Sequence, residues 1–275
     1  EMIQKSTLYV VATPIGNLGD ISLRALDVLM AVDVIAAEDT RNSRKLLAHH
    51  SITKKMIALH QHNERLASKK VLDLLEAGKS VAYITDVGTP GISDPGAILV
   101  SLARKKYCVV PIPGANAALC ALSAAGISTA HFLFYGFLPA SKSTRRRKLE
   151  EIKSSPYVLV FYEAPHRILG CIEDLSEVLG AEREITIGRE LTKLFETIHT
   201  CALGDALAWL NADTNQQRGE FVLIVSGAEL PDKSRISNQA EHTLRLLLKE
   251  LPLKQAVKLT SDITNENKNQ LYKMA

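Results

Sequence analysis

The chain has 275 residues, of which 46% are hydrophobic and 5% aromatic, with 33 Lys and Arg against 30 Asp and Glu. A chain this apolar can bury a sizeable core, which excludes intrinsic disorder, and its length predicts about two domains. A core supplied mainly by Ala, Leu, Ile and Val favours an α/β class over an all-β sandwich. The four cysteines are far apart, without a Cys-x-x-Cys pair. This indicates reduced core residues of a cytoplasmic protein and not a disulfide framework or zinc site.

One long stretch, residues 107–141, carries no Asp, Glu, Lys or Arg. Pro111, Pro113 and Gly114 interrupt it and leave a helix of about eleven residues, where a membrane span needs about twenty. No signal peptide is visible, because the first seven residues are polar and the apolar run that follows is short. We therefore expect a soluble protein that does not span a membrane.

Strands and helices alternate from the start of the chain. Apolar runs predict strands at 8–12, 32–37, 55–59, 81–85 and 107–111, and helical spacing predicts helices at 22–31, 41–49, 64–77 and 115–125. A further helix is expected to start at Asp94, as N-cap, with Pro95 in its first position. This alternation with short loops predicts a largely parallel sheet covered on both faces.

The rhythm changes near residue 127, and a mixed α+β unit follows. Strands are expected at 132–137, 157–162, 184–189, 195–201 and 220–226, with 184–189 and 195–201 paired as an antiparallel hairpin. Its clearest helix is expected at 168–179, ending at Gly180. After a polar linker come three short helices, at 239–251, from Pro252, and from a cap at Thr264 or Asn265, which resemble a helix-turn-helix module. The expected domains are 1–127, 128–229 and 235–275.

Four loops follow the predicted parallel strands: 13–20, 38–41, 86–96 and 113–117. Ligands bind beyond the carboxyl ends of strands in open α/β sheets, so these loops are expected to form the site. The loop 86–96 holds three glycines, two prolines and two aspartates, which indicates a rigid turn that a ligand can approach closely. The first loop matches neither a dinucleotide fingerprint nor a Walker A loop.

Seven motifs occur in one order: TPIGNLGD at 13–20, AEDTR at 37–41, DxGTPxxxDPG at 86–96, PGANA at 113–117, FxGFLP at 134–139, FYEAPHR at 161–167 and RELTK at 189–193. Together they resemble the bacterial small-subunit rRNA cytidine 2′-O-methyltransferases, a family of the tetrapyrrole methylase superfamily. Tetrapyrrole-modifying relatives usually carry a GxGPGD first loop. The loop found here favours the rRNA branch.

The resemblance implies a two-domain tetrapyrrole-methylase-like fold, S-adenosyl-L-methionine bound in the cleft, and a homodimer. It also implies 2′-O-methylation of a cytidine ribose in the decoding region of 16S rRNA in the small ribosomal subunit. By position in the motifs, it implies a cofactor site formed by Pro14, Gly88, Thr89, Ile92, Asn116, Ala117, Tyr162, Leu191 and Phe221.

Methyl transfer needs a hydroxyl aligned with the methyl group, so positioning is expected to dominate, with help from a base. The candidates that we favour as catalytic are Glu163, Lys193, Arg41 and Glu38. Asp39, Asp94, Glu190, Arg167 and Arg189 are further candidates, although a helix start explains Asp94 without chemistry.

Other polar and aromatic residues have simpler interpretations. His60 and His62 lack a third and fourth ligand at plausible spacing, so no metal is expected, and Asn63 is expected to cap the next helix. His166 is expected to form hydrogen bonds near the cleft, and Trp209 to pack in the core.

Basic charge gathers in two places. Residues 1–230 hold 25 basic and 25 acidic side chains, whereas residues 231–275 hold 8 and 5. A local excess lies at 142–153, around Arg145-Arg146-Arg147-Lys148. Both segments suit phosphate contacts to folded RNA, although a solvated helix face explains them equally well. Tyr135 and Phe137 suit base stacking, and a buried strand explains them equally well.

Two other functions stay open. One is a small-molecule methyltransferase of the tetrapyrrole type, which would be indifferent to RNA. The other is a non-catalytic RNA-binding or ribosome-assembly protein, which would not bind the methyl donor.

Overall fold

The structure is a computed structural model that describes residues 3–93, 95–128, 131–230 and 235–275. The predicted N-cap Asp94 lies outside these residues. The chain divides into two compact units, residues 1–227 and 228–275, and each is described by itself. In the described residues no helix has the length and apolar character that a membrane crossing requires.

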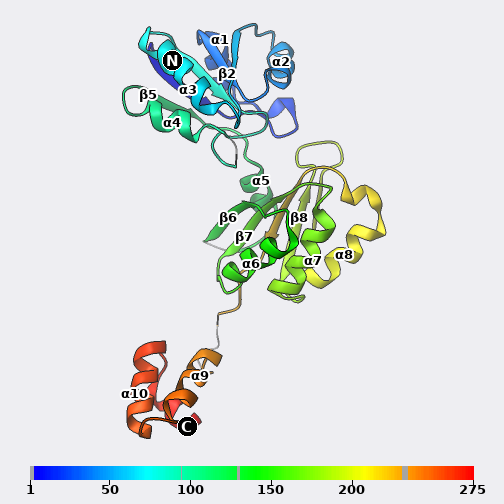
Figure 1. Cartoon of the computed structure of the whole chain (residues 1–275). Coiled ribbons are helices and arrows are strands. Elements are labelled where there is room, and N and C mark those ends of the chain that lie inside the picture. Colours follow the sequence, from blue (N-terminus) through cyan, green and yellow to red (C-terminus); the bar gives the residue numbers. More distant parts are fainter. Residues whose placement is uncertain (1–2, 94, 129–130, 231–234) are drawn as a thin grey trace. The chain divides into compact units, whose positions relative to one another are not determined.

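The first sheet has five parallel strands, as the alternating pattern predicted, and their order is β3-β2-β4-β1-β5. Helices connect its strands along the chain (Figure 1). Its elements are β1 (Thr7–Val11), the 3-10 turn η1 (Leu18–Asp20), α1 (Leu23–Ala31), β2 (Val34–Ala37), α2 (Thr40–His49), β3 (Lys55–Ala58), α3 (Glu64–Glu76), β4 (Val81–Ile84), α4 (Ala97–Ala103) and β5 (Cys108–Ile112).

Both faces of this sheet are covered. Successive residues of a strand point to opposite faces, so Val81 and Tyr83 of β4 pack with α3 and α4, while Ala82 and Ile84 pack with α1 and α2. This explains why all four residues of β4 are buried. Strand β5 lies at the edge, and its Cys108 is exposed, which corrects the expectation that all four cysteines are core residues.

Helix α4 begins at Ala97, two residues later than predicted, with Gly96 as its N-cap. The carboxylate of the buried Glu64 accepts the N–H groups of Gly96 and Ile98 at 2.9 and 3.0 Å. Gly96 has a φ of 125°, a conformation that side chains rarely adopt. The first free N–H groups of the helix are thus satisfied from α3, 32 residues away in the chain.

The second sheet is mixed, in the order β6-β7-β10-β8-β9, with β6 and β7 parallel and the other neighbours antiparallel. The predicted β8–β9 hairpin is confirmed. The elements are α5 (Ala117–Ala124), β6 (Phe132–Phe137), α6 (Lys142–Ile152), β7 (Val158–Glu163), α7 (Ile168–Leu179), β8 (Glu184–Arg189), β9 (Thr197–Ala202), α8 (Leu203–Ala212), the 3-10 turn η2 (Thr214–Gln217) and β10 (Phe221–Val225).

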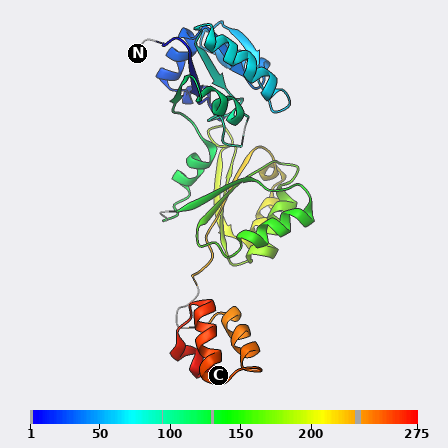
Figure 2. The same cartoon turned by 60° about the vertical axis from the view of Figure 1, so that its left-hand side comes forward.

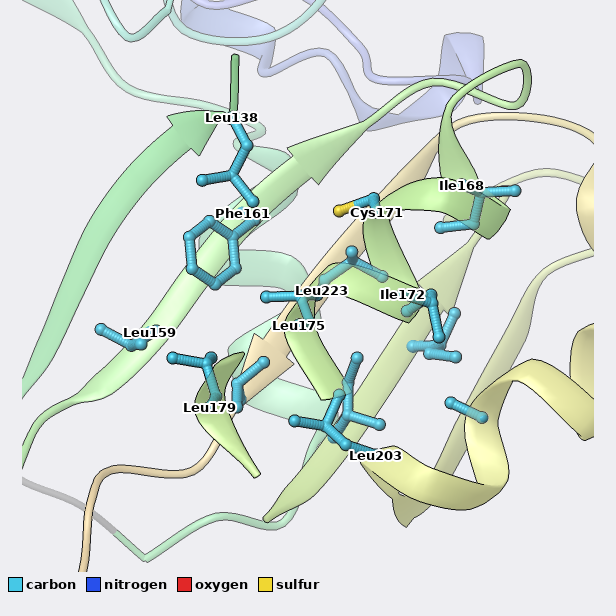
Figure 3. Packing of buried hydrophobic residues seen from close by; sticks show 14 of the residues in the cluster. Leu138, Leu159, Phe161, Ile168, Cys171, Ile172, Leu175, Leu179, Leu203 and Leu223 are labelled. Atoms are coloured by element: carbon cyan, nitrogen blue, oxygen red, sulfur yellow. The ribbon is translucent and has the colours of Figure 1, made fainter. Parts of the chain in front are cut away.

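The core of this second part lies between the sheet and helices α6, α7 and α8 (Figure 3). Phe161 of β7 and Leu223 of β10 pack there against Cys171 and Leu175 of α7. Helix α5 covers the opposite face, where Ala118 and Ala121 pack with Val160 and Ile224. Ile15 from the loop after β1 joins the same cluster, so apolar packing connects the two sheets.

Among its described residues the C-terminal unit holds three helices, α9 (Asn238–Leu247), α10 (Leu253–Thr264) and α11 (Lys268–Met274) (Figure 2). Their apolar side chains form a small core of their own. Pro252 precedes α10 as predicted. The predicted cap of the third helix is wrong. Asn265 adopts a left-handed conformation that ends α10, and Asn267 caps α11 by accepting the N–H of Asn269.

Candidate active site

A cavity of about 530 Å³ lies between the loops that follow the parallel strands and the ends of β6, β7 and β10. The first part of the chain lines it with Ile15, Glu38, Asp86, Val87, Gly88, Thr89, Ile92, Ser93, Asn116 and Ala117. The second part lines it with Phe137, Tyr162, Glu163, Ala164, Pro165, His166, Leu191, Glu220, Phe221 and Val222. Its size falls within the usual range for small-molecule sites.

Hydrogen bonds join the loops of the first part. The N–H of Thr13 donates to the carbonyl of Gly88 at 3.0 Å, and the Thr89 hydroxyl donates to the carbonyl of Ala115 at 2.9 Å. Gly88 has a φ of 77°, and a Cβ there would lie 3.3 Å from Ile15. This position therefore needs glycine, and it brings backbone to the wall of the cavity.

The two parts also touch around the cavity. The N–H of Ala118 donates to the hydroxyl oxygen of Tyr162 at 3.3 Å. A Cβ on Gly136 would lie 2.8 Å from the hydroxyl oxygen of Ser93, and one on Gly16 would lie 2.7 Å from the Lys193 side chain. These contacts define how closely the glycine-bearing loops approach the second sheet.

The structure brings together eight of the nine predicted cofactor residues. Gly88, Thr89, Ile92, Asn116, Ala117, Tyr162, Leu191 and Phe221 all line the cavity. The ninth, Pro14, is buried between Thr13 and Ile15 and does not line it. Asn116 also caps α5, since its side-chain oxygen accepts the N–H of Leu119.

Of the four favoured catalytic residues, Glu38 and Glu163 line the cavity, and Arg41 and Lys193 do not. The Arg41 side chain is 86% exposed and lies 3.6 Å from an oxygen of Asp39. The Lys193 ammonium lies 3.4 Å from Glu190 and 3.2 Å from Glu220. Burial alone would lower the pKa of Lys193, but these two carboxylates outweigh it and raise that pKa.

Glu163 is buried, with 3% of its surface exposed, although it carries a carboxylate. Its Oε1 accepts the N–H of Ala164 at 2.8 Å, and among the described residues its Oε2 accepts no hydrogen bond within geometric limits. Behind it lies the core residue Cys171, whose pKa is raised well above the ordinary value by burial and, secondly, by the Glu163 charge. Glu163 thus stands at the boundary between core and cavity.

Glu38 and Asp86 form a second acidic group on the cavity wall. An oxygen of Glu38 accepts the N–H of Asp86, and an oxygen of Asp86 accepts the N–H of Asp39, both at 3.2 Å. Burial raises the pKa of both Glu38 and Asp86. The side chain of Asp39 instead caps α2, and the N–H of Arg41 lowers its pKa.

Among the cavity residues that were not in the predicted site, three are titratable: Asp86, His166 and Glu220. Asp86 opens the loop that the sequence had singled out, and His166 was expected near the cleft. Glu220 had no sequence signal. Four carboxylates, Glu38, Asp86, Glu163 and Glu220, line the cavity, and none of the described residues that line it is Lys or Arg. Such a wall attracts cations and repels phosphates.

Several other candidates have structural roles. Arg189 is buried and donates to the carbonyls of Arg218 and Phe195. Glu190 accepts the N–H of Glu220 at 2.8 Å, and Arg167 takes the N-cap position of α7. Trp209 packs against the core as predicted, stacked on His199 at 4.2 Å.

The rings of His60 and His62, which follow β3, have centroids 6.0 Å apart. In the described part of the chain, no three His, Cys, Asp or Glu side chains gather in a way that could hold a metal. Asn63 takes the N-cap position of α3, but the expected side-chain cap is wrong. Its side-chain oxygen turns back to accept the N–H of His60 at 2.8 Å.

Arg145 and Arg146 have acidic partners within the fold, where the sequence left phosphate contacts and a solvated helix face both open. Both guanidinium groups bond the buried carboxylate of Asp174 on α7, at 2.7 and 2.8 Å. The Arg145 side chain is only 7% exposed. On the same helix, Lys148 pairs with Glu151, while Arg147 is exposed.

Family models match most of the chain. Residues 7–207 match the tetrapyrrole (corrin/porphyrin) methylases, and residues 235–275 match a model described as the RsmI C-terminal helix-turn-helix domain.

Two curated relatives named ribosomal RNA small subunit methyltransferase I are similar over almost the whole chain. The one from Vibrio cholerae is 49% identical over 97% of this chain and 93% of the relative. The one from Pseudomonas aeruginosa is 48% identical over 98% of this chain and 96% of the relative.

Solved structures share the fold at low identity. A cobalamin biosynthetic enzyme, cobalt precorrin-4 methyltransferase, aligns with a TM-score of 0.58 at 16% identity, over 80% of this chain and 95% of that chain. Uroporphyrin-III-C-methyltransferase from Thermus thermophilus aligns with a TM-score of 0.55 at 18% identity, over 80% and 94%.

Proposed function

This chain belongs to the tetrapyrrole (corrin/porphyrin) methylase family, and on that basis we propose that it methylates small-subunit rRNA. In detail, we propose that S-adenosyl-L-methionine is the donor and the ribose 2′-hydroxyl of a cytidine in the decoding region of 16S rRNA is the acceptor. One observation carries the proposal. Eight predicted cofactor residues, seven of them from four separate motifs, meet around a single cavity, together with a buried carboxylate that is only partly bonded.

The cavity suits an adenosyl sulfonium donor. Gly88 leaves room for a ligand against the backbone, and Ile15, Leu191 and Phe221 offer apolar surface. The four carboxylates complement a cationic ligand, which bears a sulfonium and an ammonium group. When bound, the donor supplies a methyl group already activated by the sulfonium. Gly88, Thr89, Ile92, Asn116, Ala117, Tyr162, Leu191 and Phe221 would hold it, with Pro14 supporting the first loop.

The same wall determines how an RNA acceptor enters. Glu220 is paired with Lys193, but Glu38, Asp86 and Glu163 repel phosphates, so the backbone phosphates stay outside and an uncharged ribose hydroxyl enters. Arg41, with its side chain 86% exposed, suits a phosphate contact outside the cavity. The basic C-terminal unit suits further phosphate contacts, and the second copy of a homodimer is also proposed as a partner.

Glu163 is the carboxylate that we propose to accept or orient the proton of the attacking hydroxyl. Among the described residues its Oε2 accepts no backbone N–H, the Cys171 thiol is a polar neighbour of the carboxylate on the core side, and its burial holds it in place. Glu38 is the second candidate, because burial raises its pKa and makes it a stronger base. Lys193 acts as a positioning residue through its ion pair with Glu220, which lines the cavity.

The function is tested by transfer of a labelled methyl group from S-adenosyl-L-methionine. The acceptors are isolated 16S rRNA and small ribosomal subunits, both from cells that lack this protein. We expect one labelled cytidine whose 3′ phosphodiester resists alkaline cleavage, as a 2′-O-methyl group requires. Methylation of a porphyrinoid with no effect on RNA would favour the tetrapyrrole-type alternative. If the protein did not bind the donor, the alternative of a non-catalytic RNA-binding protein would be favoured.

The proposed role of Glu163 is tested by Glu163→Gln, which keeps the shape and removes the charge. Single-turnover methyl transfer is expected to fall by about 10²-fold or more, the usual contribution of a positioned base. Donor affinity is expected to stay within about tenfold, since the other three carboxylates remain. Glu150→Gln, on the exposed face of α6, is the matched control. An unchanged rate for Glu163→Gln would remove this residue from the mechanism.

A further inference from the structure

An aromatic side chain at the rim of the cavity takes no part in the proposed donor site or in proton transfer. Phe137 ends β6, lines the cavity and is 51% exposed. Exposing a phenylalanine forgoes the stabilisation that its burial would give. The other aromatic residues near it are used in packing. Phe134 is half-buried against Tyr162, and Tyr135 packs against Phe161 on the opposite face, in the core formed with α6 and α7.

A bulge in β6 directs Phe137 to the cavity. Phe134 pairs with Val160 and Gly136 with Phe161, so Tyr135 is an extra residue in the strand. Residues three apart in a regular strand face opposite sides of a sheet. After the bulge, Phe134 and Phe137 both lie beside Tyr162, with ring centroids 5.1 and 5.7 Å from it. Bulges often re-aim a side chain in this way next to a site.

The bulge itself depends on Gly136. This residue has a φ of 82°, and a Cβ would lie 2.8 Å from the hydroxyl oxygen of Ser93, another cavity residue. The glycine-bearing loop 86–96 therefore reaches β6 next to Phe137. The Phe137 ring packs beside Tyr162, on a strand that this loop approaches at Gly136, so it is in position before a ligand arrives, which reduces the entropic cost of binding.

The charges around the cavity restrict what this ring can meet. Four carboxylates line the wall, so a phosphate is disfavoured, whereas a nucleobase is flat and uncharged. Bases of unpaired RNA commonly stack on exposed phenylalanine or tyrosine rings. A ribose that reaches into the cavity also carries its base to the rim.

We propose that Phe137 stacks on the base of the nucleotide whose ribose enters the cavity. This inference rests on the proposed function, because it needs an RNA acceptor. It gives the bulge in β6 a role in substrate positioning. It also chooses between the two stacking candidates of the sequence, because Phe137 lines the cavity and Tyr135 packs in the core. The contact is tolerant of base identity, since every base offers a flat face.

The test compares Phe137→Leu, Phe137→Trp and Phe132→Leu. Phe132 is the control because it lies on the same strand, is 44% exposed and does not line the cavity. The assay is methyl transfer to small ribosomal subunits from cells that lack this protein, with KM for the subunits and Kd for S-adenosyl-L-methionine measured separately. Phe137→Leu removes the stacking of one base, so we expect its KM to rise about 5- to 100-fold.

Phe137→Trp is expected to keep KM within about threefold of wild type, because indole also stacks. Phe132→Leu should not change KM, and none of the three should change Kd for the donor more than about twofold. Equal KM values for wild type and Phe137→Leu would overturn this inference and leave the proposed function intact. A rise in the donor Kd of Phe137→Leu as large as its rise in KM would also overturn the inference, because Phe137 would then contact the donor and not the base. If wild type itself transferred no methyl group, the proposed function would fall and this inference with it.

Discussion

Two basic segments of this chain look alike in sequence and differ in structure. In residues 142–153, four of six basic side chains have acidic partners, and Arg145 is buried. Among the described residues of the C-terminal unit, only Arg245 pairs with an acid within 4 Å, and Lys249, Lys254, Lys258, Lys268 and Lys273 have no ion pair. Lys142, Arg145 and Arg146 use their charge to hold α6 on α7, and the second segment leaves its charge available to a partner.

The cause of the difference is one buried carboxylate. Asp174 of α7 lies in the core beneath α6, where an unpaired charge would be very unfavourable. Arg145 and Arg146 satisfy it, and Arg146 also pairs with Glu177. The C-terminal unit has an apolar core made by Ala240, Leu244 and their neighbours, so its lysines have no such role. A run of basic residues therefore indicates a nucleic-acid surface only where no buried acid lies beneath it.

The largest expected effect is the loss of stability in Asp174→Ala. This change leaves the Arg145 guanidinium buried without its counter-charge, and we expect the free energy of unfolding to fall by about 3–5 kcal/mol. The measurement is urea denaturation followed by circular dichroism. Glu177→Ala, which removes only the half-exposed partner of Arg146, should cost less than about 1 kcal/mol. Equal effects of the two variants would show that Asp174 is not the anchor of α6.

A smaller effect is expected when the chain is ended after residue 230. The remaining unit has its own cores, so it should still fold and bind the donor with a Kd within about twofold of wild type. RNA affinity at about 0.1 M salt is expected to fall at least about tenfold, because the basic helices no longer neutralise phosphates. Filter binding to 16S rRNA and calorimetry with the donor measure the two affinities. An equal loss of both would show that the C-terminal unit is needed for the fold.

The smallest expected effect separates the two basic segments directly. Lys254→Gln with Lys258→Gln removes two exposed charges from one face of α10, and Lys142→Gln with Lys148→Gln removes two paired charges from α6. For every phosphate that is no longer neutralised, the slope of log K against log salt should become shallower by about 0.7–0.9. The first pair should therefore flatten the salt dependence of RNA binding, and the second should leave it unchanged. If only the α6 pair flattened the salt dependence, the phosphate contacts would lie on α6 and not on α10.

Most of the fold followed from local patterns in the sequence. The alternation of apolar runs and helical spacing predicted both sheets, and Ser22 and Asn116 cap α1 and α5 as their residue types suggest. The site followed from topology, because loops after parallel strands meet at one edge of the sheet. This is why Gly88, Asn116 and Glu38, far apart in the chain, were expected together and line one cavity.

Two of the errors are local, since Asn265 ends α10 instead of capping α11 and Asn63 bonds His60 three residues away. The others come from pairing between residues that are distant in the chain. Asp174 buries Arg145 from 29 residues away, and Glu64 caps α4 from 32 residues away. The contribution of Glu220 to the cavity depends on which strands neighbour β10 in the sheet. No local spacing encodes these interactions, and the bulge that re-aims Phe137 is visible in the sequence only as a glycine.

The central claim, that the cavity holds the methyl donor against Gly88, is tested most directly by calorimetry with S-adenosyl-L-methionine. Wild type is compared with Gly88→Ala and Gly91→Ala. Both glycines have positive φ, so both changes add backbone strain, but only a Cβ on Gly88 would press on Ile15, and only Gly88 lines the cavity. We predict that wild type binds one donor per chain, that Gly88→Ala weakens binding at least about tenfold, and that Gly91→Ala stays within about threefold. No binding by wild type, or equal binding by the two variants, would contradict the account.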